Sequence, residues 1–190
     1  MTLNLLSLAT VKAELGIDNT DSDTAIEAMI PRVSADVRRI LNFNYDVYVP
    51  AVFDETSTSI DMGETGNFPW LQVPTSILPM GQVLYSPNLK DDTYIIGFNP
   101  STLLYSLSSL PDDSGEYVYP TVNIAMWSAI SKMIWYRIQG LTSDDVADKA
   151  IASESYGPVS LTYTESEINK QWNYPQVLID DLGIPYSEVG

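Results

Sequence analysis

The sequence predicts an α+β fold: a small helical bundle with a short N-terminal helix, two long helices and a short C-terminal helix, carrying a β-rich insertion between the long helices. Two observations lead to this prediction. Apolar residues repeat at three- and four-residue spacing before residue 42 and again after Pro120, as packed helices require. Between them, short aromatic and β-branched runs alternate with Gly, Pro, Asn and Asp. We therefore expect a helical domain of residues 1–42 and 119–190, interrupted by a β-rich insertion of residues 43–118.

Two helices are predicted near the N-terminus. Ser7 has the side chain to cap a short helix over Leu8–Leu15, and Gly16 has the conformational freedom to end it. The acidic stretch from Asp18 to Asp23 then offers a second N-cap. The following helix is amphipathic, because its apolar side chains fall within an arc of about 120°; they are Ile26, Met29, Ile30, Val33, Val37, Ile40 and Leu41.

The insertion is predicted to form short strands separated by turns. Each candidate is rich in β-branched or aromatic residues and is bounded by turn-forming residues. The candidates are Val47–Phe53, Ser57–Met62, Trp70–Val73, Gln82–Tyr85, Asp92–Ile96 and Thr102–Leu107.

The second long helix is predicted to span Pro120–Gln139, with Pro120 at the favoured first position and Gly140 after its end. Apolar side chains cover nearly its whole circumference, so we expect more than one of its faces to be buried. One of these faces is expected to pack on another subunit, through Met126, Trp127, Met133 and Trp135.

The C-terminal part is predicted to contain one half-buried strand and one short helix. Val159, Leu161 and Tyr163 alternate with Ser and Thr, which is typical of a strand with one buried face. A short helix follows Tyr174, with Pro175 at its first position and Gly183 after its end.

Composition excludes most catalytic chemistry. The 190 residues include 9 bases and 25 acids, a formal charge of −16, with no histidine and no cysteine. A Ser-His-Asp triad, a thiol nucleophile and imidazole or thiolate metal sites are therefore impossible. We expect no catalytic residue, no metal ligand, no cofactor and no enzymatic activity. The negative charge argues against electrostatic binding of the chain to a nucleic-acid phosphate backbone. Neither a signal peptide nor a membrane-spanning segment is predicted.

The order of elements resembles the head-tail connector (adaptor, or head completion) family of tailed bacteriophages. Three segments carry the resemblance, which covers roughly half the chain. The first is the N-terminal helix pair opened by Leu8-Ala-Thr-Val-Lys-Ala-Glu-Leu-Gly-Ile-Asp18, and the second is the helix Pro120–Gln139 with Arg137 near its end. The third, Ser153-Glu-Ser-Tyr-Gly-Pro-Val-Ser-Leu-Thr-Tyr163, is similar to the family's SESxGxxSxxY segment. Tyr156 departs from it, since a small or aliphatic residue is common there.

The resemblance implies a non-enzymatic virion protein, made in the host cytoplasm, that forms a ring, usually a dodecamer, below the portal protein. Such a ring prolongs the DNA channel, through which DNA passes without specific binding, and joins the head to a stopper or tail-completion protein. In this family the C-terminal segment commonly engages the portal. Carried over, this implies portal contacts at Glu154, Ser155, Tyr156, Gly157, Pro158, Tyr163, Trp172, Tyr174 and Tyr186.

Three other functions remain open. The aromatic, Asp-rich middle of the chain suits a calcium- or carbohydrate-binding β module of a virion or surface protein, with candidate rings at Phe68, Trp70, Tyr85, Tyr94, Phe98 and Tyr105. An acidic DNA mimic predicts charge spaced along one exposed element, whereas the first long helix carries Arg32, Arg38 and Arg39. A carboxylate-only enzyme is the third, and no residue stands out as its catalytic group.

Overall fold

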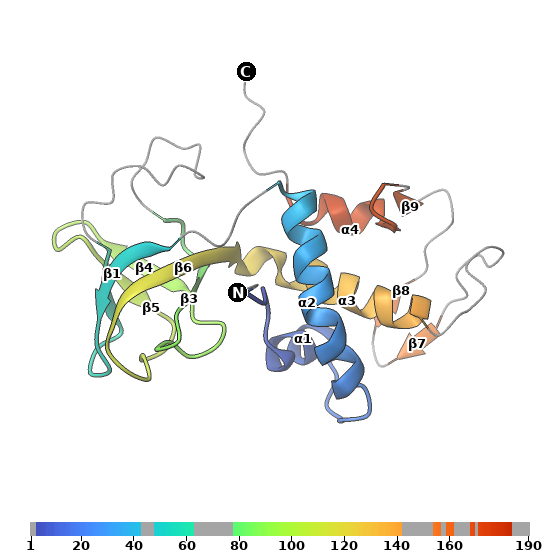
Figure 1. Ribbon diagram of the computed structural model, residues 1–190, viewed down its shortest axis with the longest axis horizontal. Coiled ribbons are helices and arrows are strands. Elements are labelled where there is room, and N and C mark those ends of the chain that lie inside the picture. The colour runs from blue at the N-terminus through green and yellow to red at the C-terminus, as the bar shows by residue number, and fades with distance from the viewer. Residues whose placement is uncertain are drawn as a thin grey trace, which may run out of the picture. The chain divides into compact units, whose positions relative to one another are not determined.

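In a computed structural model the chain divides into two compact units (Figure 1). The β unit consists of Phe43–Ala125 with Met1 and Tyr186–Gly190, and the helical unit consists of Thr2–Asn42 and Met126–Pro185. The structure describes residues 3–42, 48–62, 78–141, 154–156, 159–161, 168–169 and 171–183.

The β unit contains a six-stranded antiparallel sheet in the order β3-β6-β1-β2-β5-β4. Its outermost strands approach each other: Val83 bridges Tyr94, and the Gly81 N–H donates to the Ile95 carbonyl at 2.7 Å. The sheet is therefore nearly closed and barrel-like. Its strands are β1 (Val49–Phe53), β2 (Ser59–Asp61), β3 (Gln82–Tyr85), β4 (Ile95–Asn99), β5 (Leu104–Leu107) and β6 (Gly115–Asn123).

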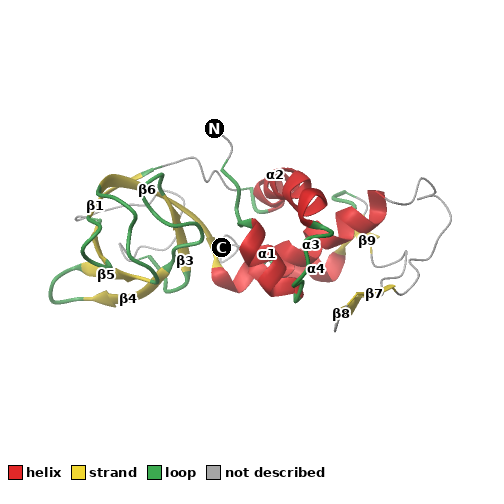
Figure 2. Cartoon of the chain, turned by 90° about the horizontal axis from the view of Figure 1, so that it is seen from below, coloured by secondary structure: helices red, strands yellow, loops and turns green. Residues whose placement is uncertain are grey.

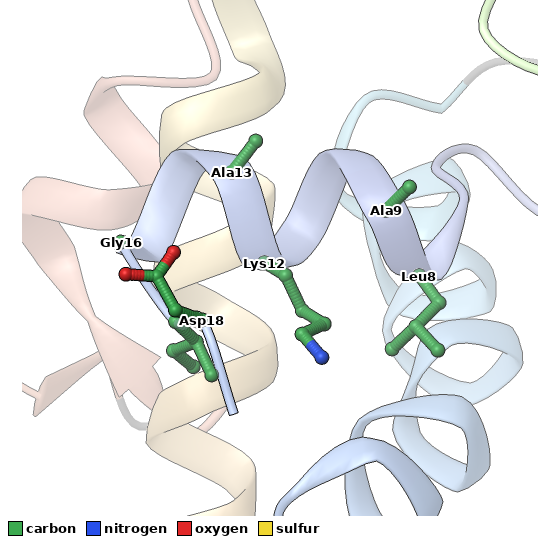
Figure 3. A pocket seen from close by; sticks show the side chains of 7 residues that line it. Leu8, Ala9, Lys12, Ala13, Gly16 and Asp18 are labelled. Carbon is green, nitrogen blue, oxygen red and sulfur yellow. The ribbon is translucent and has the colours of Figure 1, made fainter. Parts of the chain in front are cut away.

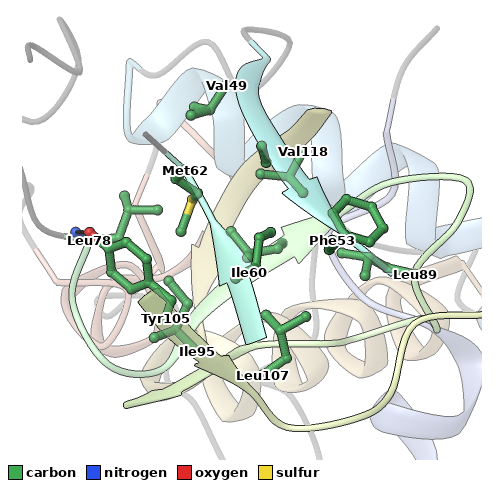
Figure 4. Close-up of a cluster of buried hydrophobic side chains, with 12 residues drawn as sticks. Val49, Phe53, Ile60, Met62, Leu78, Leu89, Ile95, Tyr105, Leu107 and Val118 are labelled. Atoms are coloured by element: carbon green, nitrogen blue, oxygen red, sulfur yellow. Dashed lines mark hydrogen bonds between the residues drawn. The ribbon is translucent and has the colours of Figure 1, made fainter. Parts of the chain in front are cut away.

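Alternating burial along these strands builds the core of the β unit. In β1 every second residue is buried, which directs one face of the strand inward. Figure 4 shows the apolar side chains that gather inside the sheet. The polar atom of one core ring is satisfied there, because the Tyr105 hydroxyl accepts the Leu78 N–H at 3.0 Å. The core residues are Val49, Ala51, Phe53, Ile60, Met62, Leu78, Leu84, Leu89, Ile95, Tyr105, Leu107 and Val118.

The helical unit is organised around α3, which contacts α1, α2 and α4 (Figure 2). Two short two-stranded sheets, β7 with β8 and β9 with β10, belong to the same unit. The helices are α1 (Leu8–Leu15), α2 (Asp23–Ile40), α3 (Trp127–Leu141) and α4 (Gln176–Asp180), and the short 3₁₀ helix η1 (Ile124–Met126) precedes α3. The strands are β7 (Glu154–Tyr156), β8 (Val159–Leu161), β9 (Ile168–Asn169) and β10 (Tyr174–Pro175).

The predicted positions of the first two helices are confirmed, but the predicted capping of the second is wrong, because its N-cap residue Ser22 makes no side-chain hydrogen bond to the helix. Helix α1 has the predicted bounds; the Ser7 hydroxyl accepts the Thr10 N–H at 3.2 Å, and Gly16 adopts φ 66° after its end. Helix α2 begins at Asp23, and its buried side chains include Ile26, Met29, Ile30, Val33 and Val37. Local signals define these helices, because a cap and an apolar stripe do not depend on distant partners.

The predicted fold class, however, is wrong. The nearly closed six-stranded sheet forms a large share of the molecule, which is not a small helical bundle with two long helices. The main error lies at Pro120, which is part of strand β6 and pairs with Leu84. The pairing shifts between Gln82 and Leu84, and such a bulge is one of the few places where a sheet accepts proline.

The second long helix consequently begins at Trp127 instead of Pro120. The Asn123 side chain accepts the Ala125 N–H at 3.0 Å and so starts the helical turn that leads into α3. The sequence predicts that the insertion ends at residue 118 and that a helix starts at Pro120, because a proline is an equally good signal for a helix start. The predicted strand Gln82–Tyr85 is confirmed as β3, and the candidate Trp70–Val73 lies outside the described residues.

Within the described part of the chain, no helix has both the length and the apolar character needed to cross a membrane.

Candidate functional site

The most connected polar cluster of the helical unit is centred on the Asp36 carboxylate of α2. Its Oδ2 accepts the Tyr174 hydroxyl at 2.8 Å and an Arg137 N–H at 3.2 Å. Its Oδ1 accepts an Arg39 N–H at 2.9 Å. We call Asp36, Arg137 and Tyr174 the Asp36 node, which links α2, α3 and β10.

The Tyr174 ring is the buried part of this node. Its side chain is 0 % exposed, the Arg137 guanidinium lies 4.4 Å from the ring centroid, and the Tyr136 ring lies 6.0 Å away. Burial raises the pKa of the Tyr174 phenol well above its usual value. The hydroxyl therefore remains a proton donor to Asp36 over the whole ordinary pH range.

The node fixes the C-terminal segment to the helix pair. Arg137 also donates to the Trp172 carbonyl at 3.5 Å, so both the backbone and the ring of this segment are held. The Asp36 carboxylate accepts three hydrogen bonds, two of them from arginines, and these bonds fix its orientation. The node is therefore suited to positioning the segment.

One side of α4, the helix that follows Tyr174, is buried and another side is exposed. Leu178 is buried, whereas Val177 is 48 % exposed. The C-terminal segment therefore combines a fixed attachment with an exposed apolar side chain.

The residues predicted to contact the portal protein are placed differently from one another. Tyr174 is buried in the node and holds the segment, while Trp172 is half-buried. Glu154, Ser155 and Tyr156 form strand β7, which pairs with Leu161, Ser160 and Val159 of β8. Gly157, Pro158, Tyr163 and Tyr186 lie outside the described residues.

The four residues predicted to form a subunit interface also differ in burial. Met133 is 0 % exposed and belongs to the core of the helical unit together with Ile130 and Ile134. Met126, Trp127 and Trp135 are half-buried. Much of the apolar circumference of α3 is thus covered within the chain itself, by α1, α2 and α4.

A groove of about 480 Å³ runs along α1 (Figure 3). The Lys12 ammonium that lines it is already paired with the Asp23 carboxylate at 2.7 Å. The groove therefore presents no unpaired lysine to an anionic ligand. Its lining residues are Leu8, Ala9, Lys12, Ala13, Gly16, Ile17 and Asp18.

Four tyrosines lie next to one another on the β unit and form what we call the tyrosine row. The ring centroids of Tyr117 and Tyr119 are 5.8 Å apart. The ring centroid of Tyr48 lies 6.2 Å from that of Tyr117 and 6.3 Å from that of Tyr119. The Tyr85 ring lies 6.3 Å from Tyr119. Of these residues only Tyr85 belongs to the aromatic rings that the sequence predicts as candidates. The signal for the others is the alternation of Tyr117 and Tyr119 around Val118, which indicates a strand where the sequence analysis predicts none.

Comparisons with family models, with curated proteins and with solved structures give no match to this chain. Among the described residues, no three Asp or Glu side chains gather in an arrangement that suits a metal ion.

Proposed function

We propose that this chain is a structural, non-enzymatic protein of a tailed-phage virion. In this proposal it forms a ring, a dodecamer, below the portal protein and joins the head to a stopper or tail-completion protein. DNA passes through the ring without specific binding.

The observation that carries the proposal is where the three segments with the family resemblance lie. They include α1 and α2, the Trp127–Gln139 part of the second segment, which lies in α3, and the paired strands β7 and β8, all of which belong to the helical unit, whereas the start of the second segment, from Pro120, lies in the β unit. The two paired strands lie within the Glu154–Leu161 part of the most specific segment. The resemblance is thus concentrated in one compact unit.

The charge of the chain supports a passive DNA channel. The formal charge is −16, and acids that face a duplex repel its phosphates. This repulsion is screened beyond about 8 Å at physiological salt, so it acts on DNA at close range and lets the duplex slide.

The C-terminal segment supplies the proposed contact with the portal protein. The Asp36 node holds it on α2 and α3, and Val177 remains exposed on α4. Fixing a segment before binding lowers the entropy cost of association, which suits a permanent joint in a virion.

Binding of the purified chain to the portal protein of the same phage tests the proposal. We expect co-sedimentation with portal rings, and an added ring of density below the portal in negative-stain images. Val177→Asp should weaken binding at least tenfold, because a charge would have to be desolvated in the joint. Leu110→Asp, at a similarly exposed apolar residue of the β unit, is the matched control and should bind normally. A chain that never associates with the portal contradicts the proposal.

A further inference from the structure

The tyrosine row is an unusual feature of the outer surface of the β unit. Tyr119 pairs directly with Tyr85 of β3, and Tyr117 pairs with Pro50 of β1. Directly paired residues of antiparallel strands lie on the same face of the sheet. Since Pro50 and Val52 alternate with the buried Val49, Ala51 and Phe53, this face is the outer one.

Several apolar side chains of the row and its surroundings are exposed. Tyr48 is 59 % exposed, Tyr117 is 40 % exposed, and Val52 at the end of β1 is 67 % exposed. The apolar core of the unit lies on the opposite face of these strands and does not need these rings. A cluster of exposed aromatic rings is typical of a surface that binds a partner.

Charge indicates the kind of partner. Phe43–Ala125 contains ten acids and a single base, Lys90. Aromatic faces in a negative field attract cations, and the planar guanidinium of arginine stacks on tyrosine rings better than lysine does.

The geometry of the rings argues against a sugar as the ligand. Tyr117 stands at 86° to Tyr119 and at 70° to Tyr48, so neighbouring rings meet edge to face. They do not form the flat platform on which a pyranose ring would stack. A guanidinium needs only one accessible ring face, because the negative end of the ring quadrupole lies on the face and not on the edge.

The chain itself carries an arginine that fits. Arg32 on α2 is exposed and has no hydrogen-bond or ion-pair partner among the described residues, whereas Arg39 and Arg137 are engaged by Asp36 and Lys12 is engaged by Asp23. Eight of the nine bases lie in the helical unit. One copy therefore carries the acidic aromatic surface and the cation that complements it.

We infer that the tyrosine row of one copy binds the Arg32 face of α2 on a second copy. This inference rests on the proposed function, because it supplies an interface between neighbours of the ring. Two different surfaces meet in such a contact, and repeated head-to-tail contacts of this type close into a ring when the rotation between neighbours allows it.

Site-directed cross-linking tests the inference, and the absence of natural cysteine makes the test clean. One preparation carries Val52→Cys beside the row, and another carries Ala28→Cys, one helical turn from Arg32. The two are mixed and treated with a flexible bismaleimide. We expect a cross-linked dimer containing one copy of each, at about ten times the yield of a control pair in which Thr102→Cys replaces Val52→Cys. All three positions are exposed.

Variants at the contact identify its chemistry. Arg32→Met should reduce the cross-link yield about tenfold and Arg32→Lys should reduce it less. Tyr117→Leu should reduce it, whereas Tyr117→Phe, which keeps the aromatic face, should retain most of it. Circular dichroism of each variant establishes that it is folded.

Three results would overturn the inference. They are a yield no higher than the Thr102→Cys control, a cross-link within one chain when both cysteines are placed on it, and loss of the cross-link on adding cellohexaose, which would show a sugar site. Portal co-sedimentation of the unmodified protein is measured in parallel. A chain that binds the portal without the cross-link keeps the proposed function and loses this inference. A chain that gives the cross-link but does not bind the portal keeps this inference and loses the proposed function.

Discussion

The two units of this chain are stabilised in different ways. The β unit depends on an apolar interior enclosed by six strands, and its charged groups are nearly all of one sign. The helical unit has an apolar core as well, but it also contains ion pairs between helices, with Asp36 joining α2 to α3 and to β10. Changes in packing should therefore act mainly on the β unit, and changes in polar contacts mainly on the helical unit.

Two spectroscopic signals separate the units. Trp127, Trp135 and Trp172 belong to the helical unit, whereas Trp70 belongs to the β unit. In a Trp70→Phe background tryptophan fluorescence therefore follows the unfolding of the helical unit, and the variants below are made in this background. The tyrosine row belongs to the β unit and contributes to the near-ultraviolet circular dichroism. Unfolding transitions recorded by both signals report on the two units separately.

The largest effect is expected for Asp36→Ala. This substitution leaves the buried Tyr174 hydroxyl without its acceptor and Arg137 without its ion-pair partner, which should cost about 3 kcal/mol. Urea unfolding followed by tryptophan fluorescence measures the loss. Glu27→Ala, at an exposed position of the same helix, should change stability by less than about 0.5 kcal/mol. Equal effects of the two substitutions would refute the role of the node.

The next largest loss of stability is expected for Gly115→Ala, and it should affect the β unit. A Cβ at this position would lie 2.2 Å from the ring of Phe53, which is part of the core, so the ring would have to move. We expect the free energy of unfolding measured from the tyrosine signal to fall by about 2 kcal/mol, and the value measured from the tryptophan signal to stay unchanged. Gly97→Ala is the control, since the nearest atom to its Cβ lies 3.9 Å away. A stable Gly115→Ala would mean that the packing described for Phe53 is incorrect.

Alkaline pH should destabilise the helical unit more than the β unit. The pKa of Tyr174 in the folded chain is raised by burial above the ordinary value of about 10. Above about pH 10 the unfolded chain loses this proton while the folded chain keeps it, so stability falls by up to about 1.4 kcal/mol per pH unit.

Tyr174→Phe removes this part of the pH dependence, and unfolding curves on either side of about pH 10 measure it. Burial also raises the pKa of Tyr136 and of Tyr105, so a weaker dependence should persist in both units. A Tyr174→Phe variant with the same pH dependence as the natural chain would argue against a protonated, buried Tyr174.

The smallest effect is an increase in stability. Ser131 on α3 is 0 % exposed, and no described residue forms a hydrogen bond with its hydroxyl. Ser131→Ala removes an unsatisfied polar group and improves helix propensity, which together should stabilise the helical unit by about 1 kcal/mol. Ser128→Ala, at a half-buried position of the same helix, measures the contribution of helix propensity alone to the change in stability. A destabilised Ser131→Ala would show that this hydroxyl has a partner.

The features predictable from the sequence were those whose causes are local. The bounds of α1 depend on Ser7 and Gly16, which act within one turn of the helix, and β3 depends on a short apolar run next to Gly81. Strand β6 was missed because its nine residues contain Pro120, and only its pairing with β1 and β3 makes a strand there favourable. The near-closure of the sheet comes from the bridge between Val83 and Tyr94 and from the Gly81–Ile95 hydrogen bond, which no sequence pattern indicates.

The candidate sites were harder to predict for the same reason. The Asp36 node joins residues separated by 101 and 138 positions, so no spacing in the sequence indicates it. Tyr174 was predicted as a contact for a partner, but its complete burial gives it a positioning role within the chain. The sequence does not distinguish Arg32 from Arg39, whereas in the structure Asp36 pairs with Arg39 and Arg137, and no described acidic residue pairs with Arg32.

The most direct measurement of the central claim is the native mass of the complex formed when the purified chain is mixed with its portal protein. The account predicts one dominant species in which a closed ring, a dodecamer, is added to the portal. A chain that remains monomeric in the mixture, or that binds in a variable number of copies, would contradict it.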